Sequence, residues 1–192
     1  YSEIRAEDAK QAARAILGIP FEGPVFLFTG PLISRKQPEL LLEHFKFFSS
    51  KSTATLCVVG DGPLLERCRM IGRNSPNVLL PGHVGDLTPY LTAADVYVSA
   101  SSAEGLPNPV LEALSFGLPT ILSDIPAHAE INAFAPSSGS LVKLTKELNL
   151  FSVFDKSFLT DTRRRAALSI AKHALNAEQM AIKYSNFYKS IV

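Results

Sequence analysis

The sequence predicts one α/β domain built on a doubly wound parallel sheet. Over about the first three-quarters of the chain, short apolar runs alternate with helical patterns of about ten residues. Continuous apolar runs are typical of strands that helices cover on both faces of a parallel sheet. Sheets of this kind bind ligands at the carboxyl ends of their strands, so we expect a ligand site in the loops that follow these runs.

The first half of the chain supplies three strands and the helices between them. A helical pattern over Ser2–Leu17 runs up to Gly18, and Pro38 opens a later helix, where its missing N–H costs nothing. The turn sequence Gly60-Asp61-Gly62-Pro63 separates a strand from a polar helix. We therefore expect strands at 24–29, 53–59 and 77–80, and helices at 38–48, from the turn to about 73, and at 86–94.

The second half continues the alternation and then becomes helical. Apolar runs predict strands at 95–99 and 119–122, with a helix between them. Residues 132–140 have little pattern, and Gly139, Leu141 and Val142 suggest one last edge strand. Residues 144–191 predict two or three helices, including 161–173 and 177–190. The arginine run at 163–165 is more typical of a solvated helix face than of a binding patch.

Composition narrows the class of protein and the kind of site. The chain has 192 residues, 46% hydrophobic and 19% charged, which is ordinary for a soluble globular domain. The formal net charge of +1 gives no general attraction for nucleic acid, so any anion site must be local. Cys57 and Cys68 have no metal-binding spacing, which favours buried or inert thiols in a reducing compartment.

The ends of the sequence suggest a piece of a longer soluble protein. It begins at Tyr1 without methionine, inside a segment that predicts a helix. It contains no signal peptide and no apolar run of about 20 residues that would span a bilayer. We expect a cytoplasmic protein, with peripheral contact to the inner face of the membrane only through the full-length chain.

The segment 104–124, EGLPNPVLEALSFGLPTILSD, is the most informative stretch. Asn108 suits an N-cap, Pro109 suits the first helical position, and Gly117 ends the helix. Glu104 then lies in the loop ahead of the helix and Glu112 on its first turn. Free amides at a helix start attract phosphate, so two carboxylates flanking them indicate a nucleotide-sugar site.

The other expected strand ends place further loops on the same edge. The loops at 30–36, 60–63 and 82–85 each follow a predicted strand directly, as 99–108 does. Parallel strands end at one edge, so these four loops should form one rim.

These residues resemble the C-terminal half of GT-B fold glycosyltransferases, specifically the large retaining family 4 that builds bacterial polysaccharides and lipid-linked glycans. The resemblance covers about residues 8–191 and is densest at Glu104 and Glu112, which have the family's Glu-x7-Glu spacing. Further family motifs follow in the expected order: Gly30-x-Leu32-x3-Lys36, Gly60-Asp61-Gly62-Pro63, Asn77-Val78 with Gly82-His83-Val84, and Ala94-Asp95-Val96 with Ser99.

The resemblance implies a single Rossmann-like domain that binds the sugar donor, with the N-terminal acceptor domain absent from this chain. It implies that Glu104 and Lys36 are catalytic, that Glu112 holds the ribose hydroxyls, and that Lys36 neutralises the leaving diphosphate. The implied donor contacts are Gly30, Arg35 and Lys36; Gly82, His83 and Val84 at the base; Glu104, Gly105, Leu106 and Pro107 at the sugar; Asn108, Pro109, Val110 and Leu111 at the diphosphate; and Glu112. The family usually has arginine and glycine where this chain has Pro31 and Gln37, and Arg35 is the candidate substitute for the arginine.

The implied reaction moves a hexose-type sugar, with retention and without a metal, from a UDP- or GDP-linked donor to a glycan or lipid-linked acceptor. The chain has no D-x-D motif, and we expect no metal and no cofactor. Two alternatives stay open, a non-catalytic nucleotide-sugar binding module and a nucleotide-sugar epimerase of the same fold. A dinucleotide oxidoreductase is disfavoured because no G-x-G-x-x-G follows the first strand.

Overall fold

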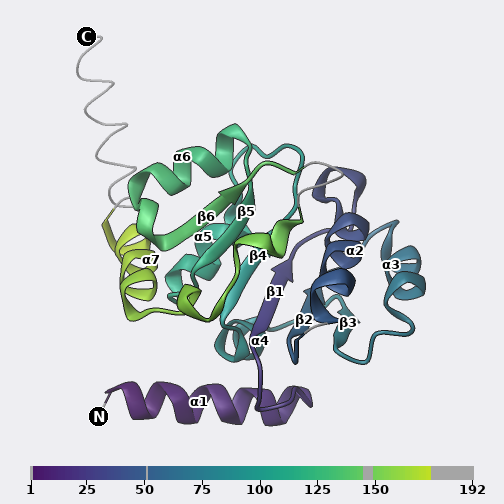
Figure 1. Cartoon of the computed structure of the whole chain (residues 1–192), viewed down its shortest axis with the longest axis horizontal. Helices are drawn as coiled ribbons and strands as arrows, with labels where there is room; N and C mark the ends of the chain where they lie inside the picture. The colour runs from purple at the N-terminus through teal and green to yellow at the C-terminus, as the bar shows by residue number, and fades with distance from the viewer. Residues whose placement is uncertain (1, 51, 145–148, 174–192) are drawn as a thin grey trace.

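The computed structural model describes residues 2–50, 52–144 and 149–173 (Figure 1). The strands are β1 (Val25–Thr29), β2 (Thr55–Val59), β3 (Val78–Gly82), β4 (Val96–Ser99), β5 (Thr120–Ser123) and β6 (Gly139–Val142). The α-helices are α1 (Ser2–Leu17), α2 (Pro38–Ser49), α3 (Leu65–Gly72), α4 (Thr88–Ala93), α5 (Asn108–Ser115), α6 (Pro126–Phe134) and α7 (Asp161–His173). Short 3-10 helices are η1 (Ser34–Lys36), η2 (Pro136–Ser138), η3 (Leu150–Val153) and η4 (Lys156–Phe158).

The six strands form one parallel sheet in the order β3-β2-β1-β4-β5-β6, which confirms the predicted α/β class. This is the order of a Rossmann domain, in which the chain reverses its direction across the sheet between β1 and β4. Ligands of such sheets bind beyond the carboxyl ends of the two strands at the reversal. The loops after Thr29 and Ser99 therefore flank the expected crevice.

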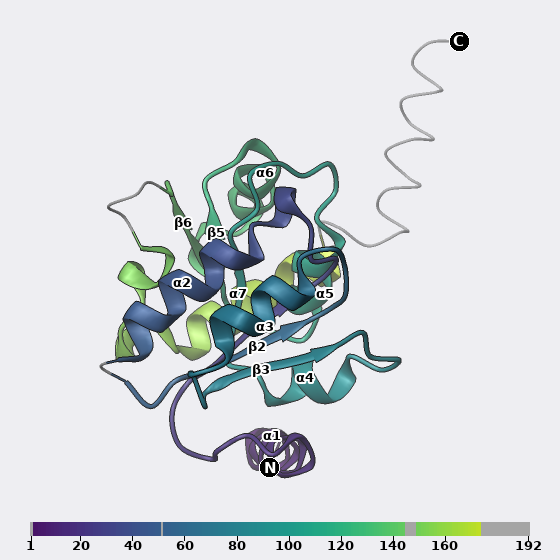
Figure 2. The same ribbon diagram turned by 90° about the vertical axis from the view of Figure 1, so that its right-hand side faces the viewer.

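Helices cover both faces of the sheet, and successive strand residues supply the two cores. Val25 and Leu27 pack in the core that includes α4, α5 and α7, whereas Phe26 and Phe28 pack in the core that includes α2 and α3. Figure 2 shows α2 and α3 on one side of the strands. Both faces of β1, β2, β4 and β5 are buried, which explains why the sequence shows continuous apolar runs there.

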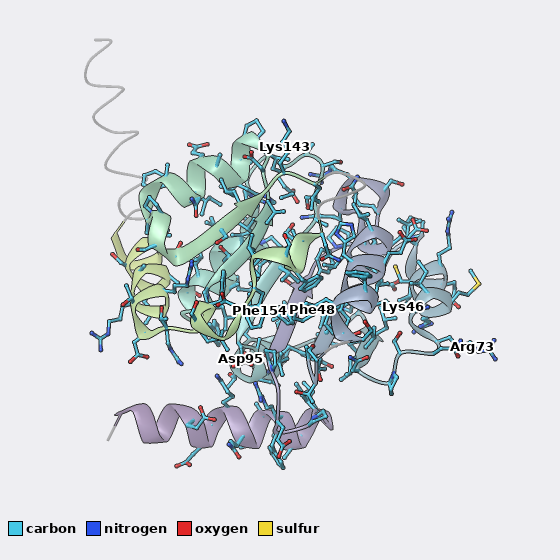
Figure 3. The ribbon with its side chains drawn as sticks, viewed as in Figure 1. Lys46, Phe48, Arg73, Asp95, Lys143 and Phe154 are labelled. Carbon is cyan, nitrogen blue, oxygen red and sulfur yellow. The ribbon has the colours of Figure 1, made fainter. Side chains whose placement is uncertain are left out.

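Aromatic side chains fill the core beneath α2. The Phe26 ring lies 4.8 Å from that of Phe154 and 5.0 Å from that of Phe151, both with edge-on geometry. Phe48 of α2 contacts Phe154 at 5.9 Å between ring centroids (Figure 3). These contacts tie the segment after β6 back to the first strand and to α2.

An ion-pair cluster fixes α1 to the amino end of the sheet, where Asp95 precedes β4 (Figure 3). The Asp95 carboxylate accepts hydrogen bonds from Lys10 at 2.7 Å, from Arg14 at 2.6 Å and from the amide of Val25 at 2.8 Å. In Figures 1 and 2, α1 and α6 lie at opposite ends of the molecule. Helix α1 thus covers the amino end of the sheet, and the loops after the strands form its carboxyl edge.

The structure corrects several element boundaries. Helix α6 was not expected, although Pro126 opens it in the same way as Pro38 opens α2. Strand β3 continues through Pro81 to Gly82, beyond its apolar run. The edge strand β6 and helix α7 are confirmed, while the helix predicted at 177–190 lies outside the described residues. No helix of the described part of the chain is both long and apolar enough to cross a membrane.

Candidate functional site

The four predicted loops do meet at one rim, where backbone hydrogen bonds join them. The amide of Leu32 donates to the carbonyl of Asp61 at 2.8 Å, and that of Gly60 donates to Gly82 at 2.9 Å. The amide of Ser102 donates to the carbonyl of Arg35 at 2.8 Å. The loops after β1, β2, β3 and β4 are therefore one connected surface.

Glycine is required where two of these loops cross. Gly60 has φ of +147°, and a Cβ there would collide with the carbonyl of Gly30. A Cβ at Gly30 itself would lie 3.8 Å from Lys36 Cε and 4.0 Å from Pro109 Cγ. Gly30, Lys36 and the start of α5 thus surround one point at the strand reversal.

The centre of the site is a buried ion pair between Lys36 and Glu104. Lys36 Nζ donates to Glu104 Oε1 at 2.6 Å, and the two side chains are only 8% and 4% exposed. Arg35 donates to Glu104 Oε2 at 2.9 Å from a side chain that is 46% exposed. The carboxylate of Glu104 therefore holds one buried and one exposed cation.

These cations keep Glu104 ionised in spite of its burial. Burial alone raises the pKa of a carboxyl, because it penalises the charged form. Hydrogen bonds from Lys36 and Ser101, together with the charges of Lys36 and Arg35, outweigh that effect and hold the pKa of Glu104 below its ordinary value. The site thus contains an ionised carboxylate beside one buried and one half-exposed cation.

Ser99, the last residue of β4, and Ser101 in the loop that follows support Glu104. The sequence analysis named Ser99 in a motif but missed Ser101 and this role. Ser101 Oγ donates to Glu104 Oε1 at 2.7 Å, and Ser99 Oγ lies 3.0 Å from Ser101 Oγ. Because Ser101 uses its proton on Glu104, Ser99 must donate to Ser101. Their spacing could have indicated this pairing from the sequence, because the side chains of residues 99 and 101 point to the same side of an extended chain.

The start of α5 differs from the prediction. Asn108 is the first residue of the helix, and Pro107 occupies the cap position with φ of −80° and ψ of 71°. These angles are those of an inverse γ-turn, in which the amide of Asn108 donates to the carbonyl of Leu106 at 2.9 Å. Asn108 is therefore not the N-cap, because the turn at Pro107 uses its amide and brings it into the helix.

The turn also changes which amides are available to an anion. The amides of Val110 and Leu111 donate to the carbonyl of Pro107, at 2.9 and 3.3 Å, and Pro109 has no N–H. Among the residues described, the amides of Glu104, Gly105 and Leu106 have no hydrogen-bond partner. A Cβ at Gly105 would meet nothing within 4 Å, so the loop ahead of the helix is open.

Glu112 lies one position further along the helix than predicted. It is the fifth residue of α5, so it is on the second turn and not on the first, because the helix begins at Asn108. Its side chain is exposed, and within the described structure its carboxylate makes no hydrogen bond or ion pair.

Burial chiefly raises the pKa of Tyr97 well above its ordinary value, and the charges of both Glu104 and Glu112 add to the effect.

A cavity of about 330 Å³ lies at the ends of β1, β2 and β3. His83 and Val84 line it, together with Gly30 and Pro31. Gly82 lies directly before these residues and has φ of +83°. The predicted base-contact segment therefore shares a wall with the loop that carries Lys36.

The structure shows the conformation and position of Gln37 and Pro31, the two residues that depart from the family pattern. Gln37 has φ of 50° and ψ of 48°, the left-handed region that glycine adopts without strain. Pro31 is exposed on the cavity wall. Arg35 stands beside Lys36, but its guanidinium contacts Glu104 and the carbonyl of Ala103.

Comparison with known proteins agrees with this architecture. The model of the family described as Glycosyl transferases group 1 matches residues 23–148. The chain belongs to this family, and its fold is that of a GT-B glycosyltransferase domain of family 4.

Individual relatives match this chain over part of their own length. The UDP-Gal:alpha-D-GlcNAc-diphosphoundecaprenol alpha-1,3-galactosyltransferase of Escherichia coli is 31% identical over 158 residues, covering 71% of this chain and 41% of the relative. The O-antigen biosynthesis glycosyltransferase WbnH of Escherichia coli is 30% identical over 169 residues, covering 86% and 46%. The chain therefore spans less than half the length of these curated relatives.

A solved structure supports the fold at lower identity. The structure of Anabaena Alr3699/HepE in complex with UDP and glucose has a TM-score of 0.78 at 17% identity, covering 95% of this chain and 52% of that one.

Proposed function

We propose that this chain is the donor-binding half of a retaining glycosyltransferase that moves a hexose-type sugar from a nucleoside diphosphate. The observation that carries the proposal is the buried Lys36–Glu104 pair at the strand reversal, with its Nζ–Oε1 distance of 2.6 Å. A cation that is fixed before the reaction begins stabilises the charge that develops on the leaving diphosphate. A fixed carboxylate beside it is suited to a sugar hydroxyl or to positive charge on the sugar ring.

We assign the other groups by what each can bind. The unpartnered carboxylate of Glu112 is an acceptor suited to the two ribose hydroxyls. The free amides of Gly105 and Leu106 suit phosphate or sugar oxygens, and the cavity at His83 and Val84 suits the base. The diphosphate then lies between Lys36 and the start of α5.

Lys36 and Arg35 supply the positive charge in this proposal, and it requires no cofactor and no metal ion. Arg35 is half-exposed, and we propose that it turns from Glu104 to phosphate, whereas buried Lys36 stays in place. We propose that the leaving phosphate itself accepts the acceptor's proton on the same face, which retains the anomeric configuration.

We propose a glycan or lipid-linked acceptor, bound by a partner domain outside this chain. The relatives named above are an undecaprenol-linked galactosyltransferase and an O-antigen glycosyltransferase, and both are longer than this chain. The donor is UDP- or GDP-linked. Cys57 and Cys68 are free and buried, as is common for cysteines in a reducing compartment, and we propose a cytoplasmic location. Burial raises the pKa of Cys57 to about 12 and that of Cys68 to about 11, which makes both thiols unreactive.

A thermal-shift screen of this chain tests the proposal. UDP, GDP and ADP are each compared with their glucose and mannose conjugates, with NAD as the negative control. A ligand at 100 times its Kd adds about 2.7 kcal/mol, so one nucleotide series should raise Tm by several degrees. No shift with any nucleotide, or a shift with NAD alone, would overturn the proposed function.

A protein that joins this chain to its proposed acceptor-binding domain tests the transfer step. With the preferred donor it should form a glycoside that keeps the donor's anomeric configuration by proton NMR. Tight donor binding without any transfer would identify a binding module, and release of free sugar without an acceptor would identify an epimerase.

A further inference from the structure

A buried histidine lies at the far end of the polar groups that hold Glu104. His128, on α6, has an exposed fraction of 0%. Its Nδ1 lies 2.9 Å from the carbonyl oxygen of Ser123 and 3.2 Å from Ser123 Oγ. A carbonyl oxygen only accepts, so Nδ1 carries the proton in this structure.

The hydroxyl of Ser123 carries the connection onward. Ser123 Oγ donates to the carbonyl of Ser101 at 2.5 Å, and Ser101 Oγ donates to Glu104 Oε1 at 2.7 Å. Since the proton of Ser123 Oγ is used on Ser101, His128 must be the donor to Ser123. Donors therefore run one way from His128 to Ser123 and from Ser123 to the backbone carbonyl of Ser101, and the side-chain hydroxyl of the same Ser101 donates to Glu104.

The other ring nitrogen shows that packing does not explain this histidine. In the described part of the chain, His128 Nε2 is buried and has no hydrogen-bond partner. A buried polar atom without a partner costs free energy, so an apolar side chain would fill this space at lower cost. The histidine is therefore explained by the bonds that its Nδ1–H makes.

We propose that His128 is a positioning residue for Glu104, acting through Ser123 and Ser101. It fixes the carbonyl of Ser101, and with it the direction in which the Ser101 hydroxyl points. The inference rests on the proposed function for its consequence, because Glu104 is the group that we place at the transferred sugar. Loss of these hydrogen bonds should leave the nucleotide part of the site intact and disturb the sugar part.

Matched variants test each of these hydrogen bonds. In His128→Asn the amide nitrogen takes the place of Nδ1 and keeps the donor, whereas His128→Leu removes it. Ser123→Ala and Ser101→Ala cut the next two links with small changes in volume. Ile131→Ala, from the buried face of the same helix, lowers stability without touching the chain of donors.

A measurement without ligand tests the positioning directly. The Glu104 carboxyl is titrated by carbon-13 NMR in glutamate-labelled protein, with Glu104→Gln identifying its signal. Ser101→Ala, Ser123→Ala and His128→Leu should all raise the pKa of Glu104, because each weakens the Ser101 hydrogen bond. His128→Asn and Ile131→Ala should leave it at the parent value. A raised pKa in Ser101→Ala but not in Ser123→Ala or His128→Leu would overturn the inference.

A binding comparison separates this inference from the proposed function. Affinities for UDP and UDP-glucose, and for GDP and GDP-mannose, are measured by calorimetry. His128→Leu should lose about tenfold of the sugar-dependent gain with nucleotide affinity unchanged, and His128→Asn should keep the gain. Equal losses for nucleotide and nucleotide sugar would contradict positioning. Failure of the parent chain to bind any of the four ligands would contradict the proposed function, while the NMR result would still decide the role of His128.

Discussion

Lys36 Nζ lies 2.6 Å from Glu104 Oε1, although the two residues are 68 positions apart in the sequence. They come from the loops after β1 and β4, the neighbouring strands between which the sheet order reverses. The pair is thus a consequence of the sheet order. It also means that a diphosphate entering this site must share Lys36 with a carboxylate that already holds it.

We predict that Glu104→Gln tightens the binding of a nucleoside diphosphate without sugar. The substitution removes a negative charge beside Lys36 and Arg35, so the local potential becomes more favourable to phosphate. Calorimetry should show a Kd for UDP or GDP that is lower by about threefold to tenfold. The matched control is Glu7→Gln on α1, which should change nothing, and weaker binding in Glu104→Gln would contradict competition for Lys36.

Lys36 and Arg35 should contribute unequally to stability. Lys36→Ala leaves Glu104 buried beside an exposed cation, and breaking a buried pair in this way costs about 3 kcal/mol of unfolding free energy. Arg35→Ala removes a half-exposed partner and should cost less than about 1 kcal/mol. Urea unfolding of the two variants measures the difference, and equal losses would show that burial of Lys36 does not matter.

Gln37→Gly should stabilise the protein. A side chain in the left-handed region costs about 1–2 kcal/mol, and glycine removes this cost. Glycine also loses more backbone entropy on folding, which offsets roughly 0.5–1 kcal/mol of the benefit. A net gain of about 0.5–1 kcal/mol is therefore expected in thermal or urea unfolding. The same substitution at Gln11, inside α1, should instead destabilise, and a loss at both positions would refute the strain at Gln37.

Stability should fall on mild acidification. Burial lowers the pKa of His128 below its ordinary 6.5, so between the folded pKa and 6.5 the unfolded chain binds more protons. The free energy of unfolding therefore rises with pH across this window and levels off above it. The lowered pKa of Glu104 acts in the same direction at lower pH, since its contribution is present above 4.5 and lost as pH falls through its folded pKa.

His128→Asn isolates the histidine's share of this pH dependence. The variant has no ionisable group at this position, so its unfolding free energy should vary less with pH just below 6.5 than that of the parent. His44, whose pKa burial also lowers, is present in both proteins and cancels from the comparison. Parallel curves for the two proteins would show that His128 does not titrate differently on folding.

Local patterns were sufficient for the fold class and for the rim of the site. Continuous apolar runs predicted the parallel sheet because its four inner strands are buried on both faces. The glycine loops lie where two backbones cross. Helix α6 escaped prediction because it opens on Pro126 soon after β5, in a stretch where the sequence shows no clear apolar period.

The contacts inside the site depend on loops that meet only in three dimensions. No local pattern indicates that the Arg35 guanidinium lies on Glu104, or that Ser123 and His128 support Ser101. Asn108 was a reasonable cap by residue type, but the γ-turn at Pro107 moved the helix start by one residue. That single shift also placed Glu112 on the second turn.

The binding role of Glu112 is the most direct test of the donor site. Calorimetry with the nucleoside diphosphate that the thermal-shift screen selects compares the parent chain with Glu112→Ala and with Glu7→Ala, an exposed glutamate on α1 at the other end of the sheet. The proposed site predicts that Glu112→Ala weakens binding by at least about tenfold, because hydrogen bonds to a charged acceptor contribute about 1.5–3 kcal/mol each, while Glu7→Ala leaves Kd unchanged. An unchanged Kd in Glu112→Ala would contradict the ribose assignment and the donor site built on it.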